Sequence, residues 1–219
     1  MVFRPPAPQS VFIPGPAGKL EAIVEDPLGD SSANPADRFG VVLHPNPQQG
    51  GTMSNKVVHT VARTLQELGI PTVRFNFRGV GKSEGSFAEG EGETDDALAV
   101  LDWAQQRWPG ATPWLGGFSF GGYVALRAAQ RHQGNPLGHL ITVSPAVHRF
   151  GVENVSAPTV PWLLIQGSAD EVVDPAAVMA WSRALRPAPR LVVLEGVDHF
   201  FHGRLQDLKD AVRAGVVPQ

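Results

Sequence analysis

The segment from Pro113 to Ala125 reads PWLGGFSFGGYVA and contains a G-x-S-x-G pattern centred on Ser119. The apolar residues Trp114 and Leu115 before the pattern favour a strand, and the run that begins at Tyr123 favours a helix. Strand, sharp turn and helix form the context of a nucleophile elbow, in which the serine hydroxyl projects above the end of a sheet. The alternative interpretation is a glycine-rich turn without chemistry.

Glycines surround the serine on both sides, at positions 116, 117, 121 and 122. A turn this sharp brings the residues two places before and after the serine close together, so we expect small residues there. The helix that follows directs its first N–H groups toward the place where negative charge would develop during a reaction at the hydroxyl.

Composition limits the class of protein. The 219 residues, of which 42% are hydrophobic and 18% charged, suit a single domain spanning residues 1–219. A net charge of -3 gives no basic surplus, so we expect neither nucleic acid nor membrane as a partner. The absence of cysteine excludes disulfides, thiolate metal sites and a cysteine nucleophile, and favours a cytoplasmic protein. We see no signal peptide and no apolar run long enough to span a bilayer.

Apolar periodicity and turn residues predict that strands alternate with helices. A hairpin of strands (10–13 and 19–25) precedes strands at 39–43, 70–77, 114–118, 137–143, 160–165 and 190–194. Helices are predicted from a cap at Ser54 to Leu68, over 93–107, after Ser119, after a cap at Asp174, and over 204–214. This order predicts a mostly parallel sheet of about eight strands with helices on both faces. Ligands of such sheets bind at the carboxyl ends of the strands.

A serine hydroxyl needs a base, and the base needs a group that orients it. Among the seven histidines, His199 directly follows the last predicted strand and fits the chain order Ser…Asp…His. His44 also lies at the carboxyl end of a strand, but early in the chain. We therefore predict His199 as the base.

The orienting carboxylate is expected between the serine and the histidine. Asp170 follows the penultimate strand and is our choice, whereas Asp174 precedes Pro175 and is better explained as a helix cap. Glu171 and Asp198 are weaker candidates.

An oxyanion hole needs two N–H donors. We expect one from Phe120, directly after the serine, and the other from the loop that begins at His44. Pro45 and Pro47 have no N–H, which favours Asn46 as the second donor and leaves Gln48 as an alternative.

Over nearly its full length the chain resembles the α/β-hydrolase superfamily, through LHPNPQQGGTMSNKVV, VRFNFRGVGKSEG, LGGFSFGGYVAL, QGSADEVVDP and GVDHFFHGRL. It is most similar to small lidless bacterial serine hydrolases near the dienelactone-hydrolase-like enzymes. The resemblance implies the α/β-hydrolase fold and a triad of Ser119, Asp170 and His199. Two departures stand out: Pro45 replaces the usual glycine of the oxyanion loop, and the dienelactone hydrolases themselves use a cysteine nucleophile.

These observations predict hydrolysis of a carboxylic ester or thioester through an acyl-serine intermediate, on a small-molecule or acyl-carrier-linked substrate. The alternatives are an amidase or acyltransferase with the same triad, and a binding protein that has lost turnover. We expect no metal and no other cofactor. Gly81-Lys82-Ser83 imitates the end of a P-loop, but Asn76 stands where that motif requires glycine.

Two further expectations concern the surroundings of the site. Residues 145–159 are too few for a cap domain, and the glycine-rich loop 78–90 would cover the site poorly. We therefore expect no cap domain, a triad open to solvent, and at most His148, Phe150 and Val152 at its mouth. Arg78 is expected to be structural, with hydrogen bonds to backbone carbonyls. We expect a monomer or a weak homodimer.

Overall fold

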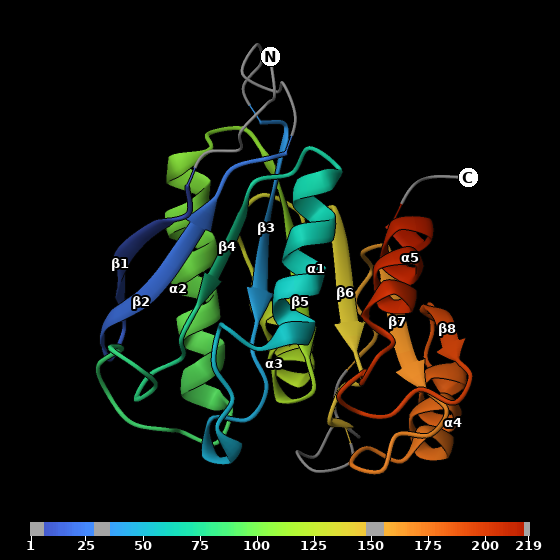
Figure 1. The fold of residues 1–219 in the computed structure, drawn as a ribbon. Coiled ribbons are helices and arrows are strands. Elements are labelled where there is room, and N and C mark those ends of the chain that lie inside the picture. The colour runs from blue at the N-terminus through green and yellow to red at the C-terminus, as the bar shows by residue number, and fades with distance from the viewer. Residues whose placement is uncertain (1–6, 29–35, 148–155, 217–219) are drawn as a thin grey trace.

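The computed structural model describes residues 7–28, 36–147 and 156–216, and these form an eight-stranded sheet flanked by helices (Figure 1). The strands are β1 (Gln9–Gly15), β2 (Gly18–Glu25), β3 (Arg38–Leu43), β4 (Thr72–Phe75), β5 (Thr112–Phe118), β6 (His139–Val143), β7 (Trp162–Gly167) and β8 (Arg190–Leu194). The helices are α1 (Lys56–Glu67), α2 (Glu91–Arg107), α3 (Phe120–Arg131), α4 (Pro175–Ala184) and α5 (Leu205–Val216), with a short 3₁₀ helix η1 (Pro47–Gln49).

The sheet has the strand order β1-β2-β4-β3-β5-β6-β7-β8. The hairpin β1–β2 and the pair β2–β4 are antiparallel, and the remaining five pairs are parallel. The prediction of a mostly parallel sheet is therefore confirmed. The carboxyl ends of β3 to β8 lie along one edge, where the loops that carry the predicted site residues meet.

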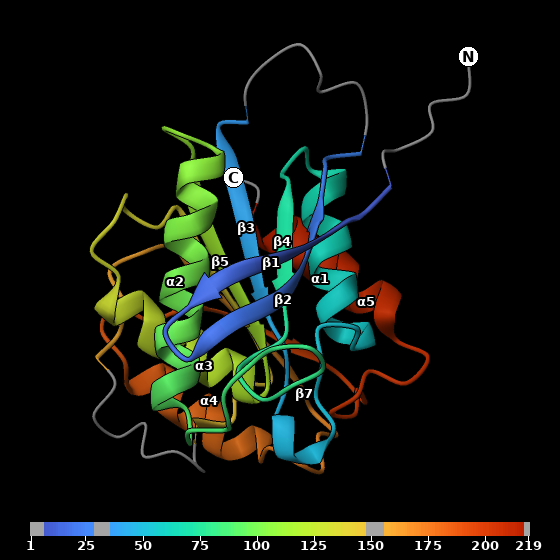
Figure 2. The same cartoon turned by 90° about the vertical axis from the view of Figure 1, so that its left-hand side faces the viewer.

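A hydrophobic core lies on each face of the sheet, where the strands pack against the helices that cover that face. Helices α1 and α5 pack against each other and bury their apolar stripes on one face, whereas α2 and α3 cover the other (Figure 2). In the described part of the chain, no helix combines the length and the apolar character needed to cross a membrane.

Helix α1 begins one residue later than predicted. The cap is Asn55, whose side chain accepts hydrogen bonds from the backbone N–H groups of Val57 and Val58, so the prediction of Ser54 as the cap is wrong. Both residue types can cap a helix, and local sequence does not decide between neighbours. The predicted cap of α4 is confirmed, since the Asp174 side chain accepts a hydrogen bond from the Ala176 N–H.

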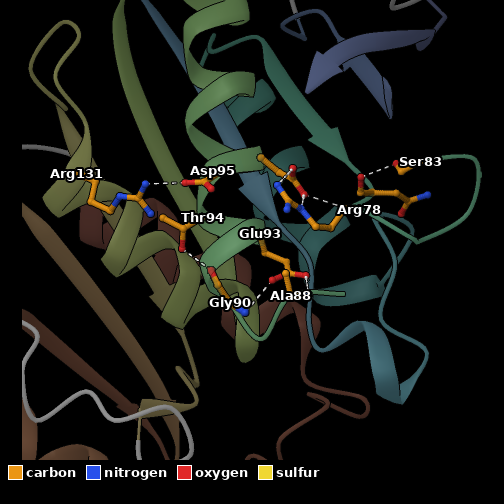
Figure 3. Close-up of polar contacts among 10 residues, drawn as sticks. Arg78, Ser83, Ala88, Gly90, Glu93, Thr94, Asp95 and Arg131 are labelled. Carbon is orange, nitrogen blue, oxygen red and sulfur yellow. Dashed lines mark hydrogen bonds and ion pairs between the residues drawn. The ribbon is translucent and has the colours of Figure 1, made fainter. Parts of the chain in front are cut away.

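A buried ion pair anchors the loop between β4 and α2 (Figure 3). Arg78 donates from Nε and Nη2 to the two carboxylate oxygens of Asp96, at 3.0 and 2.7 Å, and its backbone N–H donates to the same carboxylate. Arg78 is thus structural as expected, although its partner is a carboxylate and not the backbone carbonyls we predicted. Glu93 adds a second anchor, since its carboxylate accepts from the N–H groups of Ala88 and Gly90.

We expect Asp96→Ala to destabilise the protein by about 3–5 kcal/mol, because the substitution leaves the Arg78 guanidinium largely buried without its partner. The neighbouring Asp95 supplies a matched control, since it pairs with Arg131 at the surface, where both side chains are about two-fifths exposed. Asp95→Ala should cost about 1 kcal/mol or less. Denaturant unfolding of both variants measures the difference, and equal losses would contradict a structural role for the buried pair.

Candidate active site

Ser119 lies at the turn between β5 and α3 in a backbone conformation that residues other than glycine rarely adopt, with φ of 56° and ψ of -117°. Such a conformation costs about 1–3 kcal/mol and persists only where the surrounding structure enforces it. The Ser119 N–H donates to the Val143 carbonyl of β6, and the Ser119 carbonyl accepts from Ala146. The strained turn of a nucleophile elbow is therefore present at the predicted serine.

Two of the four flanking glycines are required by close contacts. A Cβ atom on Gly117 would lie 2.1 Å from the Gly121 carbonyl oxygen, and one on Gly121 would lie 2.5 Å from the carbonyl oxygens of Leu43 and His44. At Gly122 the nearest atom would be 3.1 Å away, on Pro145, which is tight. Gly116 has ordinary space around it, at 3.6 Å, so the expectation of a small residue there has no steric basis.

The three predicted triad residues meet at the carboxyl edge of the sheet. His199 Nε2 lies 3.1 Å from Ser119 Oγ, and His199 Nδ1 lies 2.8 Å from Asp170 Oδ2. The imidazole packs against Phe118, with ring centroids 4.9 Å apart, and against Phe200, at 5.1 Å. These distances suit proton transfer from the hydroxyl to the imidazole, with the carboxylate holding the opposite nitrogen.

Asp170 is held by four donors. One carboxylate oxygen accepts from the backbone N–H groups of Val172 and Val173, at 3.0 and 2.7 Å, and the other accepts from His199 and from Gln166 Nε2. Burial raises the pKa of Asp170, but the hydrogen bonds from His199 and the two N–H groups outweigh it and hold the pKa below its ordinary value. The carboxylate is therefore ionised and fixed in orientation.

The competing carboxylates have other partners. Asp174 caps α4, as expected, and Asp198 bonds to the side chain and backbone of His202. Glu171 accepts from the backbone N–H of His199 at 3.3 Å and does not reach its ring. Of the candidate carboxylates, Asp170 alone makes a hydrogen bond to the His199 ring within the described residues.

Gln166 is a site residue that sequence reasoning missed. It is fully buried at the end of β7, and its Nε2 donates to the Asp170 oxygen that also accepts from His199, at 3.0 Å. The signal in the sequence was its polar side chain in an otherwise apolar strand, WLLIQG, four residues before the carboxylate.

His44, the other histidine at this edge, is held in a different way. Its ring is fully buried, its Nε2 lies 3.0 Å from the Phe77 backbone N–H, and its Nδ1 lies 2.7 Å from the Pro45 carbonyl oxygen. Because Phe77 donates, Nε2 is the acceptor and Nδ1 carries the proton. Burial lowers the pKa of His44 to about 4, so the ring is neutral at pH 7.

This lowered pKa predicts a loss of stability in acid. The unfolded chain binds a proton at His44 near pH 6.5, whereas the folded chain does so only near pH 4. The stability that the neutral ring contributes is therefore fully present above pH 6.5, and it is lost as the pH falls toward 4 because protonation then favours the unfolded chain. Each unit of pKa is worth about 1.4 kcal/mol, which gives about 2–3 kcal/mol by pH 4.5. Between pH 7 and 4.5 the free energy of unfolding should fall by this much more in the wild type than in His44→Phe. Equal falls, measured by urea unfolding, would contradict the prediction.

The N–H groups of the loop after His44, where the second oxyanion donor is expected, differ in whether they already have a hydrogen-bonding partner. The Gln48 N–H donates to Asn46 Oδ1 at 2.9 Å, and those of Gln49 and Gly51 donate to the Asn46 carbonyl. The alternative donor Gln48 is therefore occupied. None of the described residues accepts a hydrogen bond from the Asn46 N–H.

A small depression with a cavity volume of about 10 Å³, partly open to solvent, lies over the serine. Its lining combines the two expected oxyanion residues with small and apolar side chains: Asn46, Gln49, Ser119, Phe120, Ala146, Val172 and Val173. The serine is 7% exposed, at the base of this depression. His148, Phe150 and Val152, the expected lining of the mouth, lie outside the described residues.

No group of three or more metal-binding side chains occurs in the described ranges.

Comparison with known proteins agrees with the fold described above. Residues 47–160 match the family model described as the alpha/beta hydrolase fold. An uncharacterized protein of Rickettsia prowazekii is 31% identical over 211 residues, which cover 92% of this chain and 86% of the relative.

Two solved structures are similar throughout. A serine hydrolase homologue from Coxiella burnetii is 41% identical, covers 95% of this chain and 97% of its own, and has a TM-score of 0.89. A serine hydrolase without a lid from Xanthomonas campestris is 44% identical, covers 98% of this chain and 95% of its own, and has the same TM-score.

Proposed function

The chain belongs to the α/β-hydrolase family, and from this premise we propose that it is a serine hydrolase that cleaves a carboxylic ester or thioester through an acyl-serine intermediate. The observation that carries the proposal is the continuous set of contacts from Ser119 Oγ to His199 Nε2 and from His199 Nδ1 to Asp170. A lidless architecture, as in the similar Xanthomonas structure, agrees with a substrate that enters directly from solvent.

In the proposed reaction, Ser119 Oγ attacks the carbonyl carbon of the substrate while His199 Nε2 accepts its proton. Asp170 keeps the proton of the neutral ring on Nδ1, so that Nε2 is free to act as the base, and then stabilises the imidazolium. The negative charge on the carbonyl oxygen is stabilised by the N–H groups of Phe120 and Asn46. His199 returns the proton to the leaving group, and a water molecule activated by the same ring hydrolyses the acyl-serine.

The dimensions of the site favour a short acyl group. The apolar part of the depression is bounded by Phe120, Ala146, Val172 and Val173, and its cavity volume of about 10 Å³ is close to that of a single water site, which leaves little room for a long acyl chain. We propose a small-molecule ester as the substrate. The alternatives from the sequence involve the same residues. Amide hydrolysis differs in the leaving group, acyl transfer differs in the acceptor of the acyl group, and a binding protein would bind the substrate without turnover.

Two measurements test the proposal. A fluorophosphonate probe should label the wild type at Ser119, as found by mass spectrometry of the labelled peptide, and a binding protein without turnover should remain unlabelled. A panel of esters, thioesters and amides with acyl chains of two to eight carbons should show the highest kcat/KM for short esters. Equal rates for all chain lengths would contradict the acyl-site assignment, and transfer to an added alcohol in preference to water would favour an acyltransferase.

A further inference from the structure

The peptide that joins Pro45 to Asn46 links a buried histidine to the proposed oxyanion hole. This peptide is trans, so its carbonyl and its N–H point in opposite directions within one rigid plane. The carbonyl oxygen accepts the Nδ1–H of His44 at 2.7 Å. Holding the Pro45 oxygen therefore sets the direction of the Asn46 N–H.

The loop packs closely against this peptide plane. A Cβ atom on Gly51 would lie 2.1 Å from the Pro45 oxygen, which shows how closely the loop folds over that carbonyl. The Gly51 N–H in turn donates to the Asn46 carbonyl at 3.0 Å. The loop thus encloses the peptide from one side, while His44 holds it from the other.

Both ends of the loop are attached to the end of β4. At the near end, His44 Nε2 accepts from the Phe77 N–H, and the two rings are in contact with centroids 4.5 Å apart. At the far end, the Met53 N–H donates to Asn76 Oδ1 at 2.9 Å and the Met53 carbonyl accepts from Arg74 at 2.7 Å. The Asn46 N–H is therefore fixed relative to β4 and not merely to its own loop.

We propose that His44 is a positioning residue for the reaction: its neutral ring, bonded to Pro45 O and the Phe77 N–H, aims the Asn46 N–H at the oxyanion that forms above Ser119. The proposal rests on the proposed function, since it needs an oxyanion to stabilise. It also accounts for a proline in place of the usual loop glycine, because Pro45 contributes its carbonyl and needs no N–H.

The test compares three substitutions in the full chain. His44→Phe keeps an aromatic ring against Phe77 but removes both hydrogen bonds. Loss of one oxyanion donor costs about 10²–10³ in kcat, so we expect a fall in kcat of about a hundredfold with KM changed by less than about threefold. His44→Asn retains a donor near the position of Nδ1 and should recover about tenfold of that loss.

His139 provides the matched control. It is also a buried histidine, its Nδ1 bonds to the Pro161 carbonyl at 2.7 Å, and burial likewise lowers its pKa. However, it begins β6 and so lies at the opposite edge of the sheet from Ser119. His139→Phe should lower the melting temperature while kcat stays within about twofold of the wild type, because the Asn46 N–H is untouched.

A transition-state analogue gives a second readout that does not depend on turnover. A trifluoromethyl ketone forms a tetrahedral adduct whose oxyanion occupies the hole, so its affinity should fall in His44→Phe in parallel with kcat. Similar kcat losses in His44→Phe and His139→Phe, or unchanged kcat and analogue affinity in His44→Phe, would overturn the positioning role. If instead the wild type is neither active nor labelled at Ser119, the proposed function itself fails. The two failures are thus distinguishable.

Discussion

Ser119→Ala is expected to lower kcat for a short ester by at least about a thousandfold and to abolish labelling by a fluorophosphonate. The reason is that the described residues offer no second hydroxyl in hydrogen-bonding contact with the His199 ring. Ser119 Oγ is the hydroxyl that lies 3.1 Å from His199 Nε2, and the chain has no cysteine that could substitute for it. The measurement is steady-state turnover, with the remaining rate compared with the uncatalysed rate.

The fold should survive this substitution. Alanine at a φ of 56° carries a similar backbone strain to serine, and the Ser119 backbone keeps its hydrogen bonds to β6 and Ala146. The melting temperature should therefore change little, which separates loss of chemistry from loss of structure. A folded Ser119→Ala protein with near wild-type turnover would contradict the assignment of Ser119 as the nucleophile.

Asp170→Asn is expected to lower kcat by up to about 10⁴-fold, because an amide in this position favours the wrong tautomer of His199. The Asp170 oxygen that contacts His199 Nδ1 also accepts from Gln166 Nε2, so two donors converge on it. If the substituted side chain turns its oxygen toward His199 and Gln166, its NH₂ group faces the N–H groups of Val172 and Val173. If it turns the other way, its NH₂ group faces the donors on His199 Nδ1 and Gln166 Nε2. Either arrangement loses hydrogen bonds that the carboxylate makes, and the second disfavours a proton on Nδ1.

Asp174→Ala is the control for this experiment. Asp174 lies four residues away and its carboxylate caps α4, so the substitution should cost about 1 kcal/mol of stability and leave kcat nearly unchanged. Comparing kcat and melting temperature for the two variants decides which aspartate orients the base. A large kcat loss at Asp174 with little effect at Asp170 would refute the assignment.

Much of the fold followed from local patterns. The G-x-S-x-G stretch predicted a strand, a tight turn and a helix around Ser119, and the alternation of apolar runs with amphipathic ones predicted a mostly parallel sheet. These features are local, because the apolar periods of strands and helices are visible in consecutive residues. A parallel sheet then brings the loops that follow its strands to one edge, whatever their sequence. The cap at Asp174 followed from its place before Pro175.

The partners of polar side chains were decided by the tertiary structure. Ser119 and His199 are 80 residues apart and Asp170 and His199 are 29 apart, so only folding fixes the distances between their side chains. For the same reason the sequence did not reveal that Gln166 donates to the Asp170 carboxylate or that Arg78 pairs with Asp96 and not with carbonyls.

The oxyanion loop shows this division within a few residues. By itself, the sequence excluded Pro45 and Pro47 as donors, because proline has no N–H. It took the folded chain to show that the Gln48 N–H is already hydrogen-bonded and that the neutral His44 ring makes two hydrogen bonds. Those outcomes depend on where a turn places its N–H groups and on how deeply a ring is buried, and both are properties of packing between segments that are distant in the sequence.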